Sequence, residues 1–215
     1  MSKETFTPQI TELISEPDNI EKLRDRVAYI LKGETQHQHA LAMDERAKDA
    51  EDYNFKVFIE NARPYDTEGE LPATPLLNIM LQKAAPMDGN PRIGAQKEKA
   101  IFVIDCIAFG NDGGETWNDK VAAARAWKAA RVIRRILMSE QYAYLGLRGV
   151  VGSRNIASIE TGVPENGGAA LSIVTARIIL EVQFMECAIS APGTVLEAIS
   201  FTLDPSSGEV LINED

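Results

Sequence analysis

The sequence predicts a single α+β domain of 215 residues, in which a mainly antiparallel or mixed sheet is flanked by helices. Three observations lead to this fold class. The periodic patterns follow the order helix, three strands, long helix, then two or three strands. Consecutive strand-like segments are joined by short, turn-rich connections, as in antiparallel pairs. Regular alternation of strand and helix is absent, which argues against a doubly wound nucleotide-binding fold.

The composition is that of a globular chain with an acidic balance. Hydrophobic residues make up 45% and charged residues 25%, and the 32 Asp and Glu exceed the 22 Lys and Arg to give a net charge of -10. This balance argues against a dedicated nucleic-acid binder, which needs a broad basic excess. No apolar run approaches the roughly 18 to 20 residues of a membrane span, and the first residues lack the apolar core of a signal peptide. We therefore expect no membrane partner.

The N-terminal part predicts one capped helix. Residues 1–9 form a flexible terminus, and Ile10, Leu13 and Ile14 indicate a short helical turn. Asp18 is a suitable N-cap for a helix over residues 20–31, which Gly33 should end. The following stretch, 33–52, is a peripheral excursion, and its pattern fits either a second surface helix or a mobile segment.

Three strands follow. Residues 54–61 alternate apolar and polar side chains, residues 75–84 form the second strand, and residues 62–75 between them are a proline-rich peripheral excursion. Residues 99–109 are apolar on both faces, as in a central strand that is covered on both sides. Asp105 interrupts this third strand, and we expect it to make a structural hydrogen bond, because no second carboxylate or base has matching spacing.

The long helix begins near Asn118, with Thr116 or Asn118 as its cap, and should end near residues 141–145, with Gly146 beyond its end. A helical wheel places seven apolar residues on one face: Ala122, Ala126, Ala129, Ala130, Ile133, Ile136 and Leu137. The opposite face carries a cationic row: Arg125, Lys128, Arg131, Arg134 and Arg135. That row is either a solvated helix face or a docking surface for the acidic face of another copy or for nucleic acid.

The C-terminal part predicts further strands. Residues 147–160 are extended, and residues 175–184 have a clear two-residue period that places Ala176, Ile178, Leu180, Val182 and Phe184 on one side. The partner of this strand could be residues 194–203, reached through a turn at Pro192 and Gly193. Residues 204–215 form a C-terminal tail with a short terminal segment.

No motif of a common enzyme class occurs in the sequence, so we expect no catalytic site and no cofactor. The sequence lacks a nucleophile elbow, a zinc-protease motif, a phosphate loop and a dinucleotide fingerprint. Cys106 and Cys187 lie in apolar, strand-like runs and should be buried, reduced thiols. His37 and His39 are two residues apart without a further ligand cluster, so we expect no metal site.

Several segments resemble a known family. They are the helical run 119–138, the phrase YLGLRG at 144–149, the strand ARIILEVQFME at 176–186, the opening ISEPDNIEKLRD at 14–25 and IDCIAFG at 104–110. Together they resemble structural proteins encoded in the tail modules of tailed bacteriophages and prophages, most of all tail terminators and neck, or head-tail joining, proteins. Other head-tail connector or tail-completion proteins are the close alternative.

The resemblance implies a non-enzymatic virion protein that is made in the host cytoplasm. Such a protein caps the finished tail tube as a six-membered ring, so the expected partners are further copies of the chain, the tail tube protein and the head-tail connector. The same ring would pass DNA through its lumen. Our hypothesis is that six residues contribute to the contact between copies or line the lumen: Arg125, Trp127, Lys128, Arg131, Arg135 and Arg148. A nucleic-acid-binding module that uses the cationic helix is the alternative of a different class.

Overall fold

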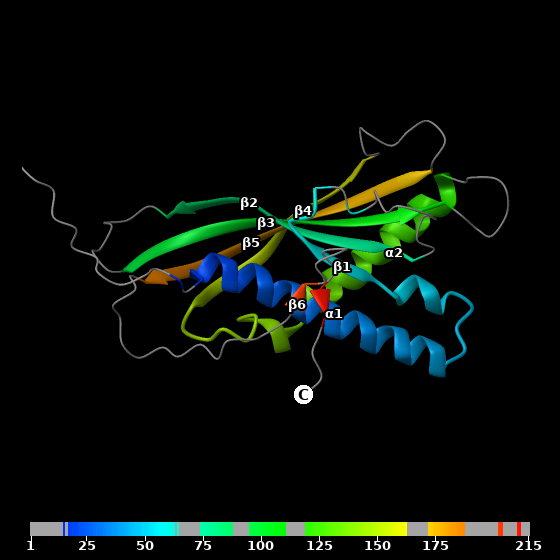
Figure 1. The fold of residues 1–215 in the computed structure, drawn as a ribbon, viewed down its shortest axis with the longest axis horizontal. Helices are drawn as coiled ribbons and strands as arrows, with labels where there is room; N and C mark the ends of the chain where they lie inside the picture. Colours follow the sequence, from blue (N-terminus) through cyan, green and yellow to red (C-terminus); the bar gives the residue numbers. More distant parts are fainter. Residues whose placement is uncertain are drawn as a thin grey trace, which may run out of the picture.

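The computed structural model describes residues 15, 17–62, 64, 74–87, 95–110, 119–162, 172–187, 202–203 and 210–211 (Figure 1). The elements in chain order are α1 (Asn19–Asp44), η1 (Ala50–Tyr53), β1 (Lys56–Ile59), β2 (Leu76–Pro86), β3 (Ala95–Phe109), α2 (Asp119–Met138), η2 (Glu140–Tyr142), β4 (Val151–Gly162), β5 (Ile173–Cys187), β6 (Thr202–Leu203) and β7 (Val210–Leu211). The expectations for residues 1–14, for the cap at Thr116 or Asn118, and for most of 62–75 and 204–215 fall outside the described residues.

Five strands form one mixed sheet, which confirms the predicted α+β class. Their order is β1-β2-β3-β5-β4; β1 runs parallel to β2, and the other neighbours are antiparallel. The predicted strands at 54–61, 75–84 and 99–109 are β1, β2 and β3, and β3 is central as its two apolar faces require. A separate sheet pairs β6 with β7.

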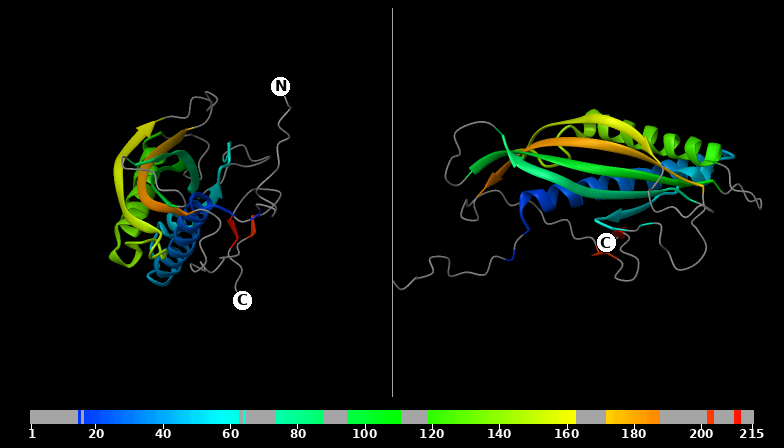
Figure 2. Two further views of the ribbon diagram at one scale, coloured as in Figure 1. Left: turned by 90° about the vertical axis from the view of Figure 1, so that its left-hand side faces the viewer. Right: turned by 90° about the horizontal axis from the view of Figure 1, so that it is seen from above.

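Both helices pack against one face of the five-stranded sheet (Figures 1 and 2), α1 mainly over β1 and β2, and α2 over β3 and β5. The predicted inward residues of β5, from Ala176 to Phe184, are all buried in this core. The seven residues predicted for the apolar face of α2 are the seven that the structure buries. No helix among the described residues is long and apolar enough to span a membrane.

The predicted end of the first helix at Gly33 is wrong, because α1 continues to Asp44. The Asp18 cap is confirmed, and Asp18 forms a capping box with Glu21. Beyond Gly33, Thr35 is fully buried and its hydroxyl donates to the Leu31 carbonyl at 2.7 Å. Glycine within a helix costs about 1 kcal/mol relative to alanine, which packing of the following turns offsets. The excursion at 33–52 is therefore the second half of α1 followed by η1.

The predicted end of the long helix near residues 141–145 is also wrong, because α2 stops at Met138. Ser139 is extended, with φ -63° and ψ 135°, and the short helix η2 follows. Arg154 of β4 holds this break: its Nε donates to the Tyr142 carbonyl at 2.6 Å and its Nη2 to the Ser139 carbonyl at 2.8 Å. A side chain 15 residues further along the chain thus satisfies carbonyls that a longer helix would have used.

The expected pairing of residues 194–203 with the strand at 175–184 is wrong. Both sides of β5 are occupied, one by β3 and the other by β4. Thr202 and Leu203, the described part of that stretch, pair with Val210–Leu211 instead. The extended segment predicted at 147–160 is β4, which fills the place next to β5.

Asp105 makes the expected structural contact. It lies on the sheet face opposite the helices, is 7% exposed, and accepts two hydrogen bonds from Arg177 on β5, from Nε at 2.7 Å and Nη2 at 2.9 Å. This hydrogen bonding raises the pKa of the Arg177 guanidinium. Cys106, the next residue, is fully buried, and burial raises the pKa of its thiol, as expected of a thiol that acts as a small hydrophobe. The side chain of Cys187 lies outside the described residues.

Candidate interaction surface on helix α2

The cationic row of α2 divides into two parts with different surroundings. Arg125 and Lys128, in the first half of the helix, turn toward the acidic segment η1. Arg131, Arg134 and Arg135, in the second half, are exposed. The structure therefore separates residues that the helical wheel had placed together.

Arg125 and Lys128 fasten η1 and the residue before it to α2. Arg125 Nε lies 3.2 Å from Asp52 Oδ1, and Lys128 Nζ lies 2.5 Å from Asp49 Oδ2 and 3.3 Å from Asp52 Oδ2. The Lys128 ammonium also lies 4.1 Å from the centroid of the Tyr53 ring, within the range of a cation–π contact.

Through these contacts, Lys128 interacts with residues of its own chain. Its side chain is only 11% exposed, and its hydrogen bond to Asp49 lowers the pKa of that carboxyl. The positive charge at this end of α2 is thus matched by carboxylates of the same molecule, and the surface it presents is nearly neutral.

The second half of α2 presents a cationic surface that the described residues do not engage in hydrogen bonds or ion pairs. Trp127, Arg131, Arg134 and Met138 are spaced at i, i+4, i+7 and i+11, so they form one line along the helix, which we call the arginine stripe. The two apolar ends are conspicuous, with Trp127 49% and Met138 56% exposed. None of the three arginines, including Arg135 beside the stripe, makes a hydrogen bond or ion pair with any residue that the structure describes.

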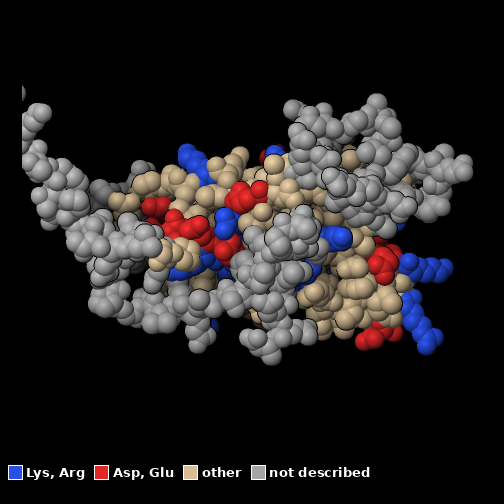
Figure 3. Space-filling model, viewed as in Figure 1, with Lys and Arg blue, Asp and Glu red and all other residues tan. Residues whose placement is uncertain are grey.

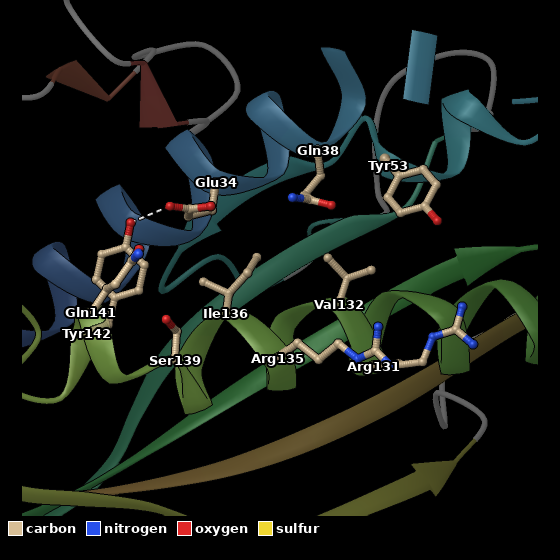
Figure 4. A pocket seen from close by; sticks show the side chains of 10 residues that line it. All are labelled: Glu34, Gln38, Tyr53, Arg131, Val132, Arg135, Ile136, Ser139, Gln141 and Tyr142. Atoms are coloured by element: carbon tan, nitrogen blue, oxygen red, sulfur yellow. Dashed lines mark hydrogen bonds between the residues drawn. The ribbon is translucent and has the colours of Figure 1, made fainter. Parts of the chain in front are cut away.

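A groove of about 540 Å³ separates α2 from α1 on one side of the stripe (Figure 4). Arg131 and Arg135 line it from α2, and Gln38 faces them from α1. At the far end, the Tyr142 hydroxyl donates a short hydrogen bond to Glu34. Burial and this bond to Glu34 raise the pKa of Tyr142 from 10.0 to about 12, so the hydroxyl keeps its proton well above neutral pH.

A second groove, of about 520 Å³, lies on the other side of α2, against β4. Its apolar lining comes from Ala124, Trp127, Ala130 and Ile159. Its cationic lining comes from Lys128, Arg131 and Arg134. The arginine stripe therefore forms a ridge between two grooves, and this combination of an aromatic anchor, arginines and hollows is typical of protein interfaces.

Arg148 is the remaining residue of the predicted set, and it lies apart in sequence, in the turn before β4. Its guanidinium lies 5.9 Å from the centroid of the Tyr144 ring, and both side chains are exposed. Within the described ranges, no hydrogen bond, ion pair or groove joins Arg148 to the arginine stripe. The structure thus brings together Trp127, Arg131 and Arg135, and engages Arg125 and Lys128 elsewhere.

Two members of this surface were not in the predicted set. Arg134 belonged to the cationic row but was not chosen, and Met138 was placed inside a longer helix. The spacing from Trp127 already carries the signal, since 127, 131, 134 and 138 share one helical line. The exposure of Met138 could not be foreseen, because it depends on the helix ending there.

The other polar groups of the described residues form no constellation for chemistry. No group of three or more His, Cys, Asp or Glu could hold a metal ion within the described ranges. His39 Nε2 lies 3.4 Å from Glu51 Oε1 without the geometry of a hydrogen bond. No protein-family model and no curated protein matches this chain.

Proposed function

We propose that this chain is a structural virion protein of a tailed bacteriophage, a tail terminator that caps the tail tube as a ring and forms the neck interface to the head connector. The observation that carries the proposal is the arginine stripe, an exposed surface of interface composition on a chain of net charge -10. The segments that resemble tail proteins include the whole of α2 and most of β5.

The charge asymmetry supports a contact between two different patches of identical chains. A heterologous contact joins two different patches of identical chains, and it produces a closed ring when the rotation between neighbours divides a full turn. A cationic patch on an acidic molecule supplies the two different patches, because each copy carries both members of the pair; the closing rotation is part of the proposal. Closure also ends growth, which is the property that a tube cap requires. We propose that the ring has six members and that no cofactor takes part.

Nucleic-acid binding is the competing function, and the arginines of α2 that make no ion pair with a described residue favour it. In a ring they could also face the lumen and meet passing DNA. The net charge of -10 opposes stable binding, because association with a polyanion would then depend on a local cationic surface such as that of the three arginines of α2. Binding to duplex DNA that is abolished by moderate salt, with an unchanged monomer mass, would favour this alternative. Other head-tail connector or tail-completion roles remain alternatives within the same structural class.

The first experiment is the mass of the purified chain by light scattering at 0.1 and 0.5 M salt. We expect a closed oligomer of about six chains, with a mass that does not grow with protein concentration. A monomer at both salt concentrations and up to millimolar protein would refute the ring. Arg125 and Lys128 are unsuitable for charge reversal, because such changes would release η1 within each monomer.

A further inference from the structure

The acidic surfaces of the described chain differ in how far their own cations neutralise them. On the sheet face opposite the helices, Arg177 pairs with Asp105, and Lys99 lies 3.1 Å from Glu181. At the C-terminal end of α1, acidic and basic side chains are mixed (Figure 3), and Asp44 and Glu45 are followed by Arg46 and Lys48. These surfaces offer no excess of negative charge to a cationic partner.

The beginning of α1 differs in part, because Asp18 and Glu21 make no ion pair with a described cation, although Lys22, Arg24 and Arg26 lie on the same turns. Asp18, Glu21 and Asp25 are spaced at i, i+3 and i+7, so they follow one line of the helix, which we call the acidic stripe. Acidic side chains gather near this end of α1 in Figure 3. Asp25 and Glu60 are already partly neutralised, because Arg24 lies between them, 2.8 Å from Asp25 and 3.9 Å from Glu60, so the uncovered negative charge of the stripe is that of Asp18 and Glu21.

Asp18 and Glu21, at the exposed start of the acidic stripe, keep free acceptor capacity. Asp18 and Glu21 each use one oxygen for the capping box, Asp18 Oδ1 accepting from the Glu21 amide and Glu21 Oε2 from the Asp18 amide. A carboxylate offers about four acceptor positions, so these bonds do not exhaust it. The Glu21 side chain is exposed, and both hydrogen bonds lie at the surface.

We propose that the acidic stripe of one copy docks on the arginine stripe of the next, an inference that rests on the proposed ring. The spacings match: Arg131 and Arg134 are three residues apart, as are Asp18 and Glu21, which on a helix is a rise of about 4.5 Å. Two helices crossing at this point can therefore place a guanidinium against a carboxylate at successive turns. Trp127 and Met138, at the two ends of the arginine pair, exclude water from the contact.

The contact is heterologous. Within the described residues, no hydrogen bond or ion pair joins the two stripes of one molecule. The acidic stripe belongs to the end of α1 that touches β5 through Asn19, whereas the α1–α2 groove involves the later residues Glu34 and Gln38. Each copy thus presents one stripe to each of two neighbours, as a ring requires.

Charge reversal on each side tests the docking. Arg131→Glu with Arg134→Glu should raise the dissociation constant of the oligomer by roughly tenfold or more, and so should Glu21→Lys with Asp25→Lys. Arg46→Glu with Lys48→Glu changes the net charge as much as the arginine variant, at the mixed end of α1, and should leave the mass unchanged. Glu21→Gln with Asp25→Asn keeps the capping-box acceptor at position 21 and should weaken association without affecting folding by circular dichroism.

Mixing the two reversed variants gives the decisive measurement. Neither should assemble alone, but an equimolar mixture should recover an oligomer with an even number of chains, because each reversed stripe then meets its complement. Failure of the mixture to assemble while both variants are folded would overturn the docking. A wild-type ring that is insensitive to both reversals would overturn it and leave the ring intact. Charge-dependent assembly into dimers or fibres would support the docking and refute the ring cap, and a strict monomer would refute both.

Discussion

Replacing Gly146 by alanine should destabilise the fold through one identifiable contact. Gly146 lies in the turn between η2 and β4 with φ +73°, a conformation that side-chain-bearing residues rarely adopt. A Cβ atom there would lie 2.5 Å from Nη2 and 3.0 Å from Nε of Arg26. The Arg26 guanidinium would have to move, and it would lose the hydrogen bond that its Nε donates to the Leu145 carbonyl at 2.9 Å.

The expected cost has two parts. Alanine at positive φ costs about 1–2 kcal/mol, of which the lower entropy of the unfolded chain returns about 0.5. The lost Arg26 hydrogen bond adds about 1–2 kcal/mol. Gly149, with φ +90° and nothing within 4 Å of an added Cβ, provides a control that has the backbone strain alone. We expect Gly146→Ala to lower the unfolding free energy by roughly 2–3 kcal/mol, and Gly149→Ala by about half as much.

Urea unfolding followed by circular dichroism measures both changes, and a double-mutant cycle isolates the contact. In an Arg26→Ala background the guanidinium is absent, so Gly146→Ala should cost only the backbone strain. The predicted coupling between positions 26 and 146 is therefore about 1–2 kcal/mol. If Gly146→Ala costs the same in both backgrounds, the Arg26 contact does not constrain this turn, and the reasoning fails.

Three further predictions concern buried polar groups. Arg177→Met should destabilise the chain more than Asp105→Asn, by roughly 1–2 kcal/mol in urea unfolding, because it leaves a carboxylate that is nearly buried without its partner; equal costs would contradict this. The pKa of Tyr142 is raised from 10.0 to about 12, so the folded state binds the phenolic proton more tightly than the unfolded state does. The stabilisation that this gives the folded state is complete below pH 10 and is lost as pH rises through 12. Tyr142→Phe should flatten the pH dependence of unfolding in that window, and an unchanged slope would count against the shift. With Cys187 replaced by alanine, the fully buried Cys106 should react with a thiol reagent only on unfolding, and fast native labelling would exclude its burial.

Local periodicity accounts for the parts of the fold that the sequence predicts. The buried face of α2 and the inward side of β5 follow directly from repeats of 3.6 and 2 residues, because each element buries one face against the same core. The capping box at Asp18 is likewise a pattern within four residues. Such features need no knowledge of the rest of the chain.

The wrong boundaries depend on contacts between distant segments. Gly33 does not end α1, because the core accepts Thr35 and the turns that follow. The end of α2 at Met138 depends on Arg154, a residue of another element that binds the Ser139 carbonyl. The pairing of β5 with β4 rather than with residues 194–203 is a choice among strands that all have suitable patterns. Neither propensity nor spacing contains this information.

The candidate surface shows the same division. The helical wheel identifies the cationic row, but it cannot show that Asp49 and Asp52 lie against its first half. Arg125 and Lys128, both in the set predicted for the contact between copies, are the two that Asp49 and Asp52 neutralise. The sequence therefore could not show how far along α2 the segment with Asp49 and Asp52 extends.

The composition of the half of α2 that no described residue covers favours an interface over a solvated face. A helix that only meets water is stabilised by Glu and Lys pairs one turn apart, whereas α2 has a single carboxylate, Asp119, at its first position. Its exposed line instead carries Trp127, two arginines and Met138, residue types enriched where proteins meet. Placing three arginines close together on one helix also costs stability through repulsion in the monomer. A partner rich in carboxylates removes that repulsion, and the beginning of α1 on another copy is the described surface that provides one.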